Sequence, residues 1–183
     1  MAPLPPLPSP PAPELVAARV AALAPTLGGA AWSLDLKRSD PIMPFMLAMG
    51  APWLIVQAVK ASGEPSATRT FTLTAEGLKD ELVAAGIFSS RTEATMWTWA
   101  PFSRPSPIGA QPACLAIDAE GRLAMHAHNA PKGLAVVSTL LPVEPDAEAP
   151  GRSVLVVQLA AVDAAGKEVL RLRRVFTRAS SKV

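Results

Sequence analysis

The sequence predicts an all-β protein, a closed antiparallel up-and-down β-barrel of about ten strands with a helix-turn-helix lid and an extra N-terminal helix. From residue 66 onward, apolar and polar residues alternate in short runs, which is typical of strands with one buried face. Turns that contain glycine or aspartate separate these runs, and no helical pattern lies between them. A meander of such strands leaves two unpaired edges, and we expect a barrel because closure removes both.

Two segments precede the barrel. Residues 1–13 are rich in proline, which fixes φ and removes amide donors, so we expect an extended or disordered arm. Residues 14–24 predict a short helix, with Glu14 in its first turn and with Pro25 and the pair Gly28-Gly29 as the signals that end it. This helix and the linker after it are assigned to residues 14–29.

The first strand and the lid come next. Residues 31–37 alternate between apolar and polar positions and predict a half-buried strand. The period then changes, because the apolar residues that follow recur at helical spacing. The sequence Gly-Ala-Pro at 50–52 interrupts this stretch, which therefore predicts a hairpin of two short helices within residues 42–60, the second of them at 53–60.

The barrel is assigned to residues 30–178, and residues 179–183 are expected to form a tail. Proline-rich loops are predicted at 101–112 and 142–150. The later strands are predicted at 68–74, 82–88, 92–99, 114–117, 123–127, 134–141, 153–162 and 168–178.

Composition argues against several classes of protein. The formal net charge is only +2 and the charges are scattered, whereas nucleic-acid binding needs a clustered basic face. Cys114 is the only cysteine, so no internal disulfide is expected. No apolar run reaches the roughly 20 residues of a membrane-spanning helix. The N-terminus lacks the basic region of a secretory signal, so we expect a cytoplasmic protein without a membrane span.

No catalytic constellation is present, since the sequence has no nucleophile elbow, phosphate-binding loop, dinucleotide fingerprint or zinc-protease motif. We therefore expect no enzyme activity, no catalytic residue and no cofactor. His126 and His128 share one strand face at a spacing that suits zinc, but a third ligand is not evident, and no metal site is expected. The alanine and leucine neighbours of Cys114 indicate an inert buried thiol.

The last predicted strand carries the first candidate for a ligand contact. Leu172, Arg174 and Phe176 share its apolar face, so Arg174 is expected to point into the barrel. A buried guanidinium needs a partner, because an unpaired charge is costly inside a protein. If a ligand carboxylate enters, Arg174 is the expected anchor, since its planar fork suits two oxygens. Otherwise we expect it to stack on Trp32 or pair with Glu93 at the barrel floor.

Aromatic and methionine side chains complete the candidate site. Tryptophans of the first strand, the lid and a middle strand are candidates to line a pocket, and methionines suit a surface that adapts to apolar partners. Ordinary core and helix packing is the competing interpretation for each of them. The candidate ligand-binding residues are Arg174, Phe176, Leu172, Trp32, Phe45, Met49, Trp53 and Trp97.

One strand, a helical hairpin and then a run of antiparallel strands is an order that resembles the fatty-acid-binding protein family, the intracellular lipid-binding proteins of the calycin group. Residues 30–34 resemble the family's opening strand, and residues 42–51 resemble its first lid helix. Residues 88–102, with Glu93 nine residues before the last of them, are similar to its middle strands. Residues 174–176 resemble the family's terminal Arg-x-Tyr. The resemblance implies a barrel that binds a fatty acid and is not an enzyme.

The sequence also departs from the family pattern. The terminal Arg-x-Tyr is replaced by Arg-x-Phe, so a tyrosine hydroxyl is missing. Near Ser138, where the family often places a second inward arginine, there is no basic residue. The family's usual clamp for a carboxylate is therefore half present, and a neutral ligand such as a sterol, a retinoid-like molecule or an alcohol stays open.

Two functions follow from these patterns. The first is binding and intracellular transport or buffering of a fatty acid or similar hydrophobic molecule by a monomer, with residues 42–60 as the portal. The second is a structural or adaptor role within a larger assembly, in which the barrel and its proline-rich extensions bind no ligand. In both cases the N-terminal arm is a candidate contact for a protein partner.

Overall fold

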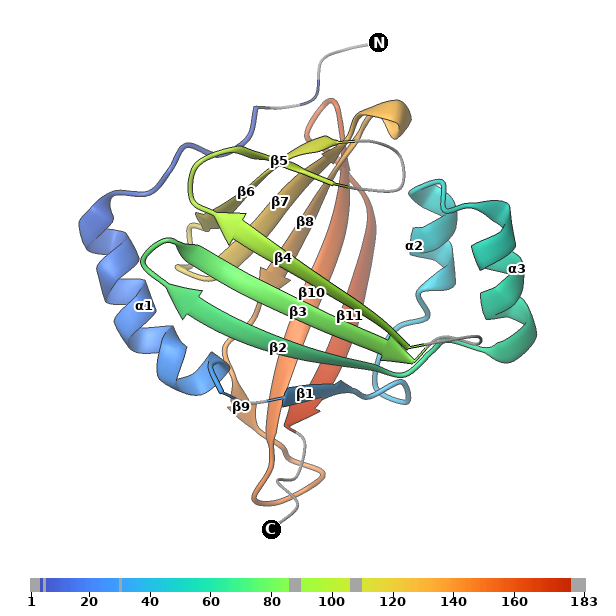
Figure 1. Ribbon diagram of the computed structural model, residues 1–183, viewed down its shortest axis with the longest axis horizontal. Helices are drawn as coiled ribbons and strands as arrows, with labels where there is room; N and C mark the ends of the chain where they lie inside the picture. Colours follow the sequence, from blue (N-terminus) through green and yellow to red (C-terminus); the bar gives the residue numbers. More distant parts are fainter. Residues whose placement is uncertain (1–3, 5, 30, 86–89, 106–109, 179–183) are drawn as a thin grey trace.

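In the computed structural model, the chain folds into a single antiparallel sheet (Figure 1). The structure describes residues 4, 6–29, 31–85, 90–105 and 110–178. Within these residues the sheet has eleven strands in the order β4-β3-β2-β1-β11-β10-β8-β7-β6-β5, and β9 pairs with β10. The strands are β1 (Ala31–Leu34), β2 (Ala67–Thr74), β3 (Gly77–Ala85), β4 (Ser90–Thr98), β5 (Phe102–Arg104), β6 (Gln111–Ile117), β7 (Leu123–Asn129), β8 (Leu134–Leu140), β9 (Glu144–Pro145), β10 (Ser153–Asp163) and β11 (Glu168–Arg178). The helices are α1 (Pro13–Leu27), α2 (Met43–Ala48), α3 (Trp53–Ser62) and a short 3₁₀ helix, η1 (Ala130–Lys132).

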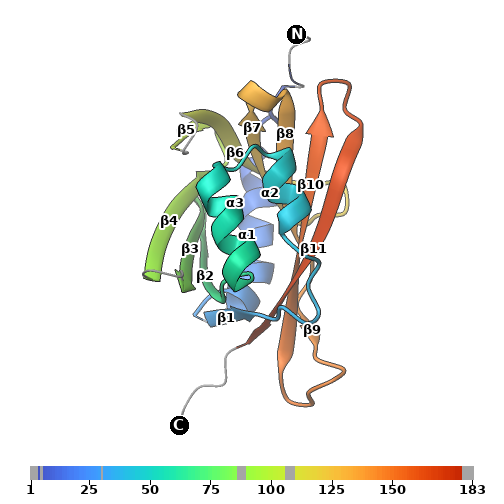
Figure 2. The ribbon, with the colours of Figure 1, turned by 90° about the vertical axis from the view of Figure 1, so that its right-hand side faces the viewer.

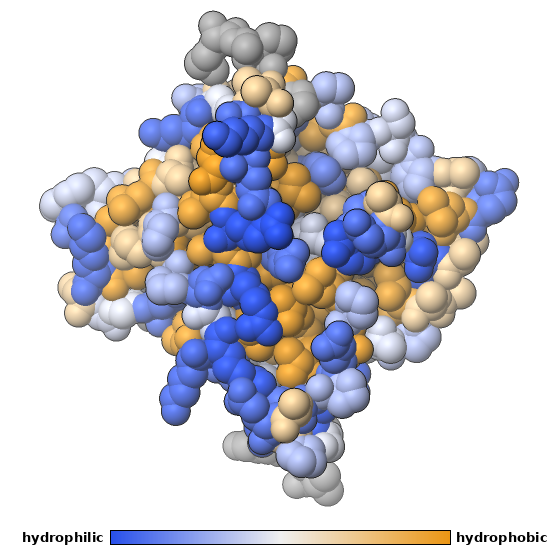
Figure 3. Space-filling view, turned by 180° about the vertical axis from the view of Figure 1, so that it is seen from behind, coloured by the Kyte–Doolittle hydropathy of each residue, from blue (hydrophilic) through white to orange (hydrophobic). Residues whose placement is uncertain are grey.

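Inward and outward positions alternate along part of β11, as the sequence predicts, although Val175 on its outward face is also buried. In β11, Leu172, Arg174 and Phe176 are buried, whereas Arg171 and Arg173 are exposed. Seen from behind, the molecule shows the outer side of this part of the sheet, where apolar patches lie between polar side chains (Figure 3). Because a slip of one residue would exchange the two faces, this burial pattern sets the register of the sheet.

Helices cover both ends of the barrel. α2 and α3 lie together over one end, and α1 lies over the other (Figures 1 and 2). Val16 and Leu27 of α1 join Trp32 of β1 in one core cluster, and the indole N–H of Trp32 donates to the Leu27 carbonyl at 3.4 Å. The extra N-terminal helix therefore closes the end opposite the lid. Among the described residues, no helix is both long enough and apolar enough to span a bilayer.

The two end strands of the sheet meet through side chains. β4 and β5 end the strand order, and no ladder joins them among the residues that the structure describes. Instead, the ring of Trp97 in β4 meets the ring of Phe102 in β5 edge-on, with centroids 6.0 Å apart. β5 is short and is flanked by Pro101 and Pro105, which have no amide donor for a ladder. The antiparallel β-fold is thus as predicted, but its predicted closure by strand pairing is not confirmed.

The first helix runs past the end predicted for it. α1 includes Pro25 and ends at Leu27, which is buried. Pro25 lies in the last turn and has no amide hydrogen, so α1 has one backbone hydrogen bond fewer there. Burial of Leu27 in the core therefore outweighs the local signal to stop.

Short strands form inside both predicted loops. β5 and the start of β6 lie within 101–112, and β9 lies within 142–150. Tertiary pairing with long neighbouring strands explains these additions, because the segments themselves are too rich in proline to signal a strand. Ala30, Phe88 and the tail 179–183 lie outside the described residues.

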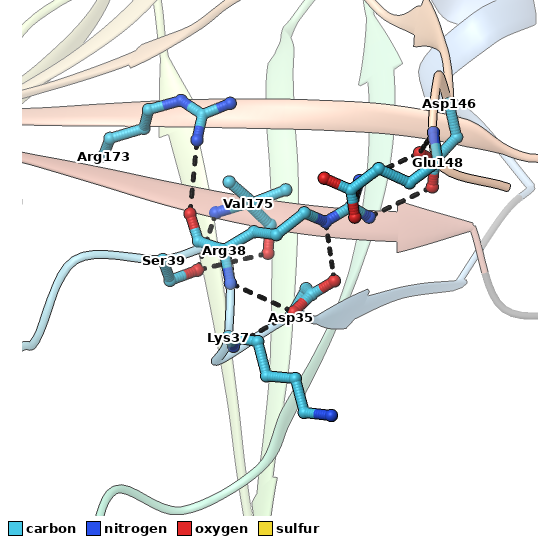
Figure 4. Close-up of polar contacts among 8 residues, drawn as sticks. All are labelled: Asp35, Lys37, Arg38, Ser39, Asp146, Glu148, Arg173 and Val175. Atoms are coloured by element: carbon cyan, nitrogen blue, oxygen red, sulfur yellow. Dashed lines mark hydrogen bonds and ion pairs between the residues drawn. The ribbon is translucent and has the colours of Figure 1, made fainter.

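An ion-pair network on the outer surface holds the segment between β1 and α2. Arg38 Nε donates to Asp35 at 2.8 Å, and its terminal nitrogens donate to Asp146 at 2.8 and 3.0 Å (Figure 4). The hydrogen bonds from Arg38 hold the pKa of Asp146 below its ordinary value. The Val175 amide donates to Ser39 Oγ at 2.9 Å. The chain that leads into the lid is therefore fixed against β11.

Candidate functional site

The lid helices and the strands below them border a cavity of about 450 Å³. Small-molecule sites in proteins usually span about 300 to 1,000 Å³, so the cavity is large enough for a small ligand. Phe45, Met49 and Ile55 reach it from the lid. Its apolar lining is completed by Leu82, Trp97, Met125, Ala127, Val136 and Leu159.

One ion pair lies in the cavity wall. Arg69 of β2 donates from Nε to Asp80 Oδ1 of β3 at 3.1 Å, and Arg69 Nη2 contacts Asp80 Oδ2. The rings of Phe71 and Phe176 lie 5.3 and 5.8 Å from the guanidinium carbon of Arg69. Two carboxylate oxygens and two aromatic faces therefore satisfy this arginine.

A second guanidinium in the wall makes no hydrogen bond to a carboxylate among the residues that the structure describes. Arg104 of β5 lies over the ring of Trp97, with 5.2 Å between the guanidinium carbon and the ring centroid. Its enclosed Nε has no hydrogen-bond partner among the described residues. Burial lowers the pKa of Arg104 below its ordinary value, and the nearby charge of Arg69 acts in the same direction, while Glu93 and Asp80 oppose the shift. Arg104 is therefore a desolvated cation at the edge of an apolar space.

Two more polar atoms near the cavity lack partners in the described part of the chain. They are Trp97 Nε1, a donor, and Asn129 Oδ1, an acceptor. Both residues line the cavity and are buried, with 6% and 7% of their surfaces exposed. Asn129 Nδ2 donates to the Met49 carbonyl at 3.0 Å, which ties β7 to the lid. The cavity thus combines an apolar lining with several unsatisfied polar atoms, an arrangement that suits an amphipathic ligand.

Comparisons with known proteins show the fold. No protein-family model and no curated protein matches the chain. A fatty acid binding protein of Schistosoma mansoni, solved in complex with arachidonic acid, is 16% identical with a TM-score of 0.55, covering 86% of this chain and 99% of that chain. Fatty-acid-binding protein 1 of Echinococcus granulosus is 11% identical with a TM-score of 0.55, covering 85% of this chain and 98% of that chain. Human cRBP IV is 14% identical with a TM-score of 0.53, covering 82% of this chain and 96% of that chain. The chain has the fold of the fatty-acid-binding proteins.

This fatty-acid-binding-protein fold confirms the resemblance that the sequence suggested. The matches cover nearly all of those chains, at 96% to 99%, but only 82% to 86% of this one. The chain therefore carries additions to the shared fold. The additional length is consistent with the predicted extensions at the N-terminus and in the proline-rich loops.

The fold brings some of the candidate ligand-binding residues together and separates others. Three of them, Phe45, Met49 and Trp97, line the cavity. Leu172 packs with Phe45 in a smaller apolar cluster, and Trp32 and Phe176 belong to the main core. Trp53, at the start of α3, is 72% exposed and lies on the outer surface of the lid.

Arg174 points inward as predicted, but it contacts the base of the lid. Its Nη1 donates to the Asp40 carbonyl at 2.6 Å and to Glu64 Oε2 at 3.2 Å, and its Nη2 contacts Glu64 Oε1. Glu64 Oε2 also accepts from the Ile42 amide at 3.3 Å. Asp40 precedes α2 and Glu64 follows α3, so Arg174 joins both ends of the helical hairpin to β11. The partner is thus Glu64, whereas the sequence suggested Trp32 or Glu93.

Two cavity residues that are not among the sequence-based candidates, Arg69 and Asp80, lie at positions that the alternation of apolar and polar residues predicts to face inward. Arg69 alternates with the buried Phe71 along β2, and Asp80 alternates with the buried Leu78 along β3. Both positions therefore point inward by the same rule that placed Arg174. Arg104 carries no such signal, because its strand lies within a segment predicted as a proline-rich loop.

The two histidines of β7 differ in their relation to the cavity. His128 lines it, and burial together with the neighbouring His128 lowers the pKa of His126 below its ordinary value. In the ranges that the structure describes, no group of three or more histidine, cysteine, aspartate or glutamate residues is placed to hold a metal ion.

Proposed function

We propose that this chain binds an amphipathic molecule with one acidic head group, a fatty acid or a similar compound, and transports or buffers it in the cytoplasm. The observation that supports this function is the desolvated guanidinium of Arg104 beside a largely apolar cavity. A carboxylate next to Arg104 would receive charge-assisted hydrogen bonds and offset the cost of the buried charge.

The hydrocarbon chain of such a ligand would pack along the apolar lining beneath the lid. Burial of each methylene group contributes about 0.8 kcal/mol, so a chain of moderate length would supply most of the affinity. Phe45, Met49 and Ile55 of the lid border the cavity. Entry and exit would therefore require α2 and α3 to move, which gives the helical hairpin the role of a portal.

Proteins with this fold support a lipid ligand. The Schistosoma mansoni protein was solved in complex with arachidonic acid, which is a fatty acid. The Echinococcus granulosus protein is likewise named as a fatty-acid-binding protein. A cavity of about 450 Å³ at the same kind of barrel is in keeping with these cases.

Binding is tested with delipidated full-length protein. We expect native mass spectrometry to detect a one-to-one complex with decanoate, and decanoate to displace a fluorescent apolar probe. Decanol has the same chain without the charge, so it is expected to bind at least about tenfold more weakly. If neither compound binds, the proposed function is wrong, and the structural or adaptor role without a ligand is favoured.

A further inference from the structure

Two arginines line the cavity, and their charges are compensated to different extents. Arg69 and Arg104 both border it. Asp80 accepts two hydrogen bonds from Arg69. Among the described residues, Arg104 Nε has no hydrogen-bond partner, and Asp80 and Glu93 act on Arg104 only through longer-range attraction. The cavity lining therefore holds one arginine that contacts a carboxylate directly and a second, Arg104, on which the described carboxylates act from a longer range.

The ion pair with Asp80 leaves Arg69 with little capacity for a ligand. Its guanidinium lies against the rings of Phe71 and Phe176, at 5.3 and 5.8 Å. The side chains of Arg69 and Asp80 are 18% and 7% exposed, so solvent screens their attraction only weakly. An incoming head group would therefore meet the guanidinium of Arg104 rather than that of Arg69.

We propose that Asp80 is a specificity-determining residue: by pairing with Arg69, it leaves Arg104 as the guanidinium open to a head group and selects singly charged head groups over doubly charged phosphate esters. This inference rests on the proposed function, since it concerns the head-group end of the same cavity. A phosphate dianion loses more hydration on entry than a carboxylate does, and one guanidinium compensates only half of its charge.

The test compares head groups on one hydrocarbon chain. Decanoate, decyl phosphate and decanol are titrated at about pH 8, above the second pKa of a phosphate monoester. We expect the wild-type protein to bind decanoate at least about tenfold more tightly than decyl phosphate. Asp80→Asn keeps the side-chain shape and removes the charge, so we expect it to shift this ratio at least about tenfold toward decyl phosphate. Decanol binding is expected to stay unchanged, because decanol has no charge to compensate.

Glu81→Gln is the matched control. It removes a carboxylate from the outer face of the same strand, where Glu81 pairs with Lys79 at 2.9 Å. We expect this variant to leave the ratio of decanoate to decyl phosphate affinity unchanged, since its charge faces solvent. An unchanged ratio in folded Asp80→Asn would overturn the proposal, and so would an equal shift in Glu81→Gln.

A second variant decides the question if Asp80→Asn does not fold. Arg69→Leu combined with Asp80→Leu removes the pair as a unit, and a neutral pair predicts a ratio of decanoate to decanol affinity within about threefold of that of the wild type. A fall of more than about tenfold in this ratio would mean that Arg69 contacts the head group, which overturns the proposal. Failure of the wild-type protein to bind decanoate and decanol would instead overturn the proposed function.

Discussion

Replacement of Arg104 by methionine is expected to weaken decanoate binding by about 30-fold or more, equivalent to about 2 kcal/mol. Methionine retains much of the apolar volume that packs on the Trp97 ring, but it cannot donate to a carboxylate. Decanol affinity is therefore expected to stay within about threefold of wild type. Titration calorimetry or probe displacement measures both affinities.

Arg104→Lys is the control for charge alone. Lysine keeps a positive charge but loses the planar fork and its stacking on Trp97. We expect its decanoate affinity to lie between those of the wild type and Arg104→Met. If Arg104→Met bound decanoate as tightly as the wild-type protein, the head group would not lie at β5.

Replacement of Arg174 by methionine is expected to lower the free energy of unfolding by about 3 kcal/mol. The substitution leaves Glu64 without its guanidinium partner at the base of the lid, where the Glu64 side chain is only 18% exposed. It also removes the hydrogen bond to the Asp40 carbonyl, so both ends of the helical hairpin lose their link to β11. Urea titration followed by far-UV circular dichroism measures the change.

Two variants serve as references for Arg174. Arg173→Met removes the exposed neighbour on the same strand, with its hydrogen bond to the Arg38 carbonyl at 3.2 Å, and is expected to cost at most about 1 kcal/mol. Addition of Glu64→Gln to Arg174→Met is expected to recover part of the loss, because no carboxylate is then left unpaired. Ligand binding distinguishes a structural role of Arg174 at the base of the lid from a role as the ligand anchor. Folded Arg174→Met is expected to keep the wild-type ratio of decanoate to decanol affinity. A selective loss of decanoate binding would make Arg174 the anchor instead.

The strand pattern was predictable because burial of one face imposes a period of two. The alternation around Phe71 and the inward face of Arg174 appear in the sequence and in the fold alike. The helical hairpin was predictable for a similar reason, since its apolar residues change to helical spacing and Gly-Ala-Pro interrupts them. Strand β5 was not, because its existence depends on pairing with β6 across a proline-rich segment.

The candidate site was predictable only in part. Alternation states which face a residue occupies, but it does not state which residues meet across the barrel. Arg174 and Glu64 are separated by 110 positions, and only the fold brings them together. Arg69 and Asp80 lie on inward faces that the sequence shows, yet their pairing depends on the register between β2 and β3. The position of Arg104 depends on the pairing of β5 with β6, and in the described part of the chain no carboxylate is hydrogen-bonded to it.

The head-group position is tested most directly by NMR of the side-chain N–H groups. Trp97 Nε1 and Arg104 Nε have no hydrogen-bond partners within the residues described, and both residues line the cavity. The indole N–H of Trp32, bonded near α1 at the far end of the barrel, is the internal reference. We predict that decanoate shifts the Trp97 and Arg104 signals saturably at one-to-one stoichiometry and leaves the Trp32 signal in place. Saturable binding that leaves the Trp97 and Arg104 signals unmoved would contradict a ligand held at this site.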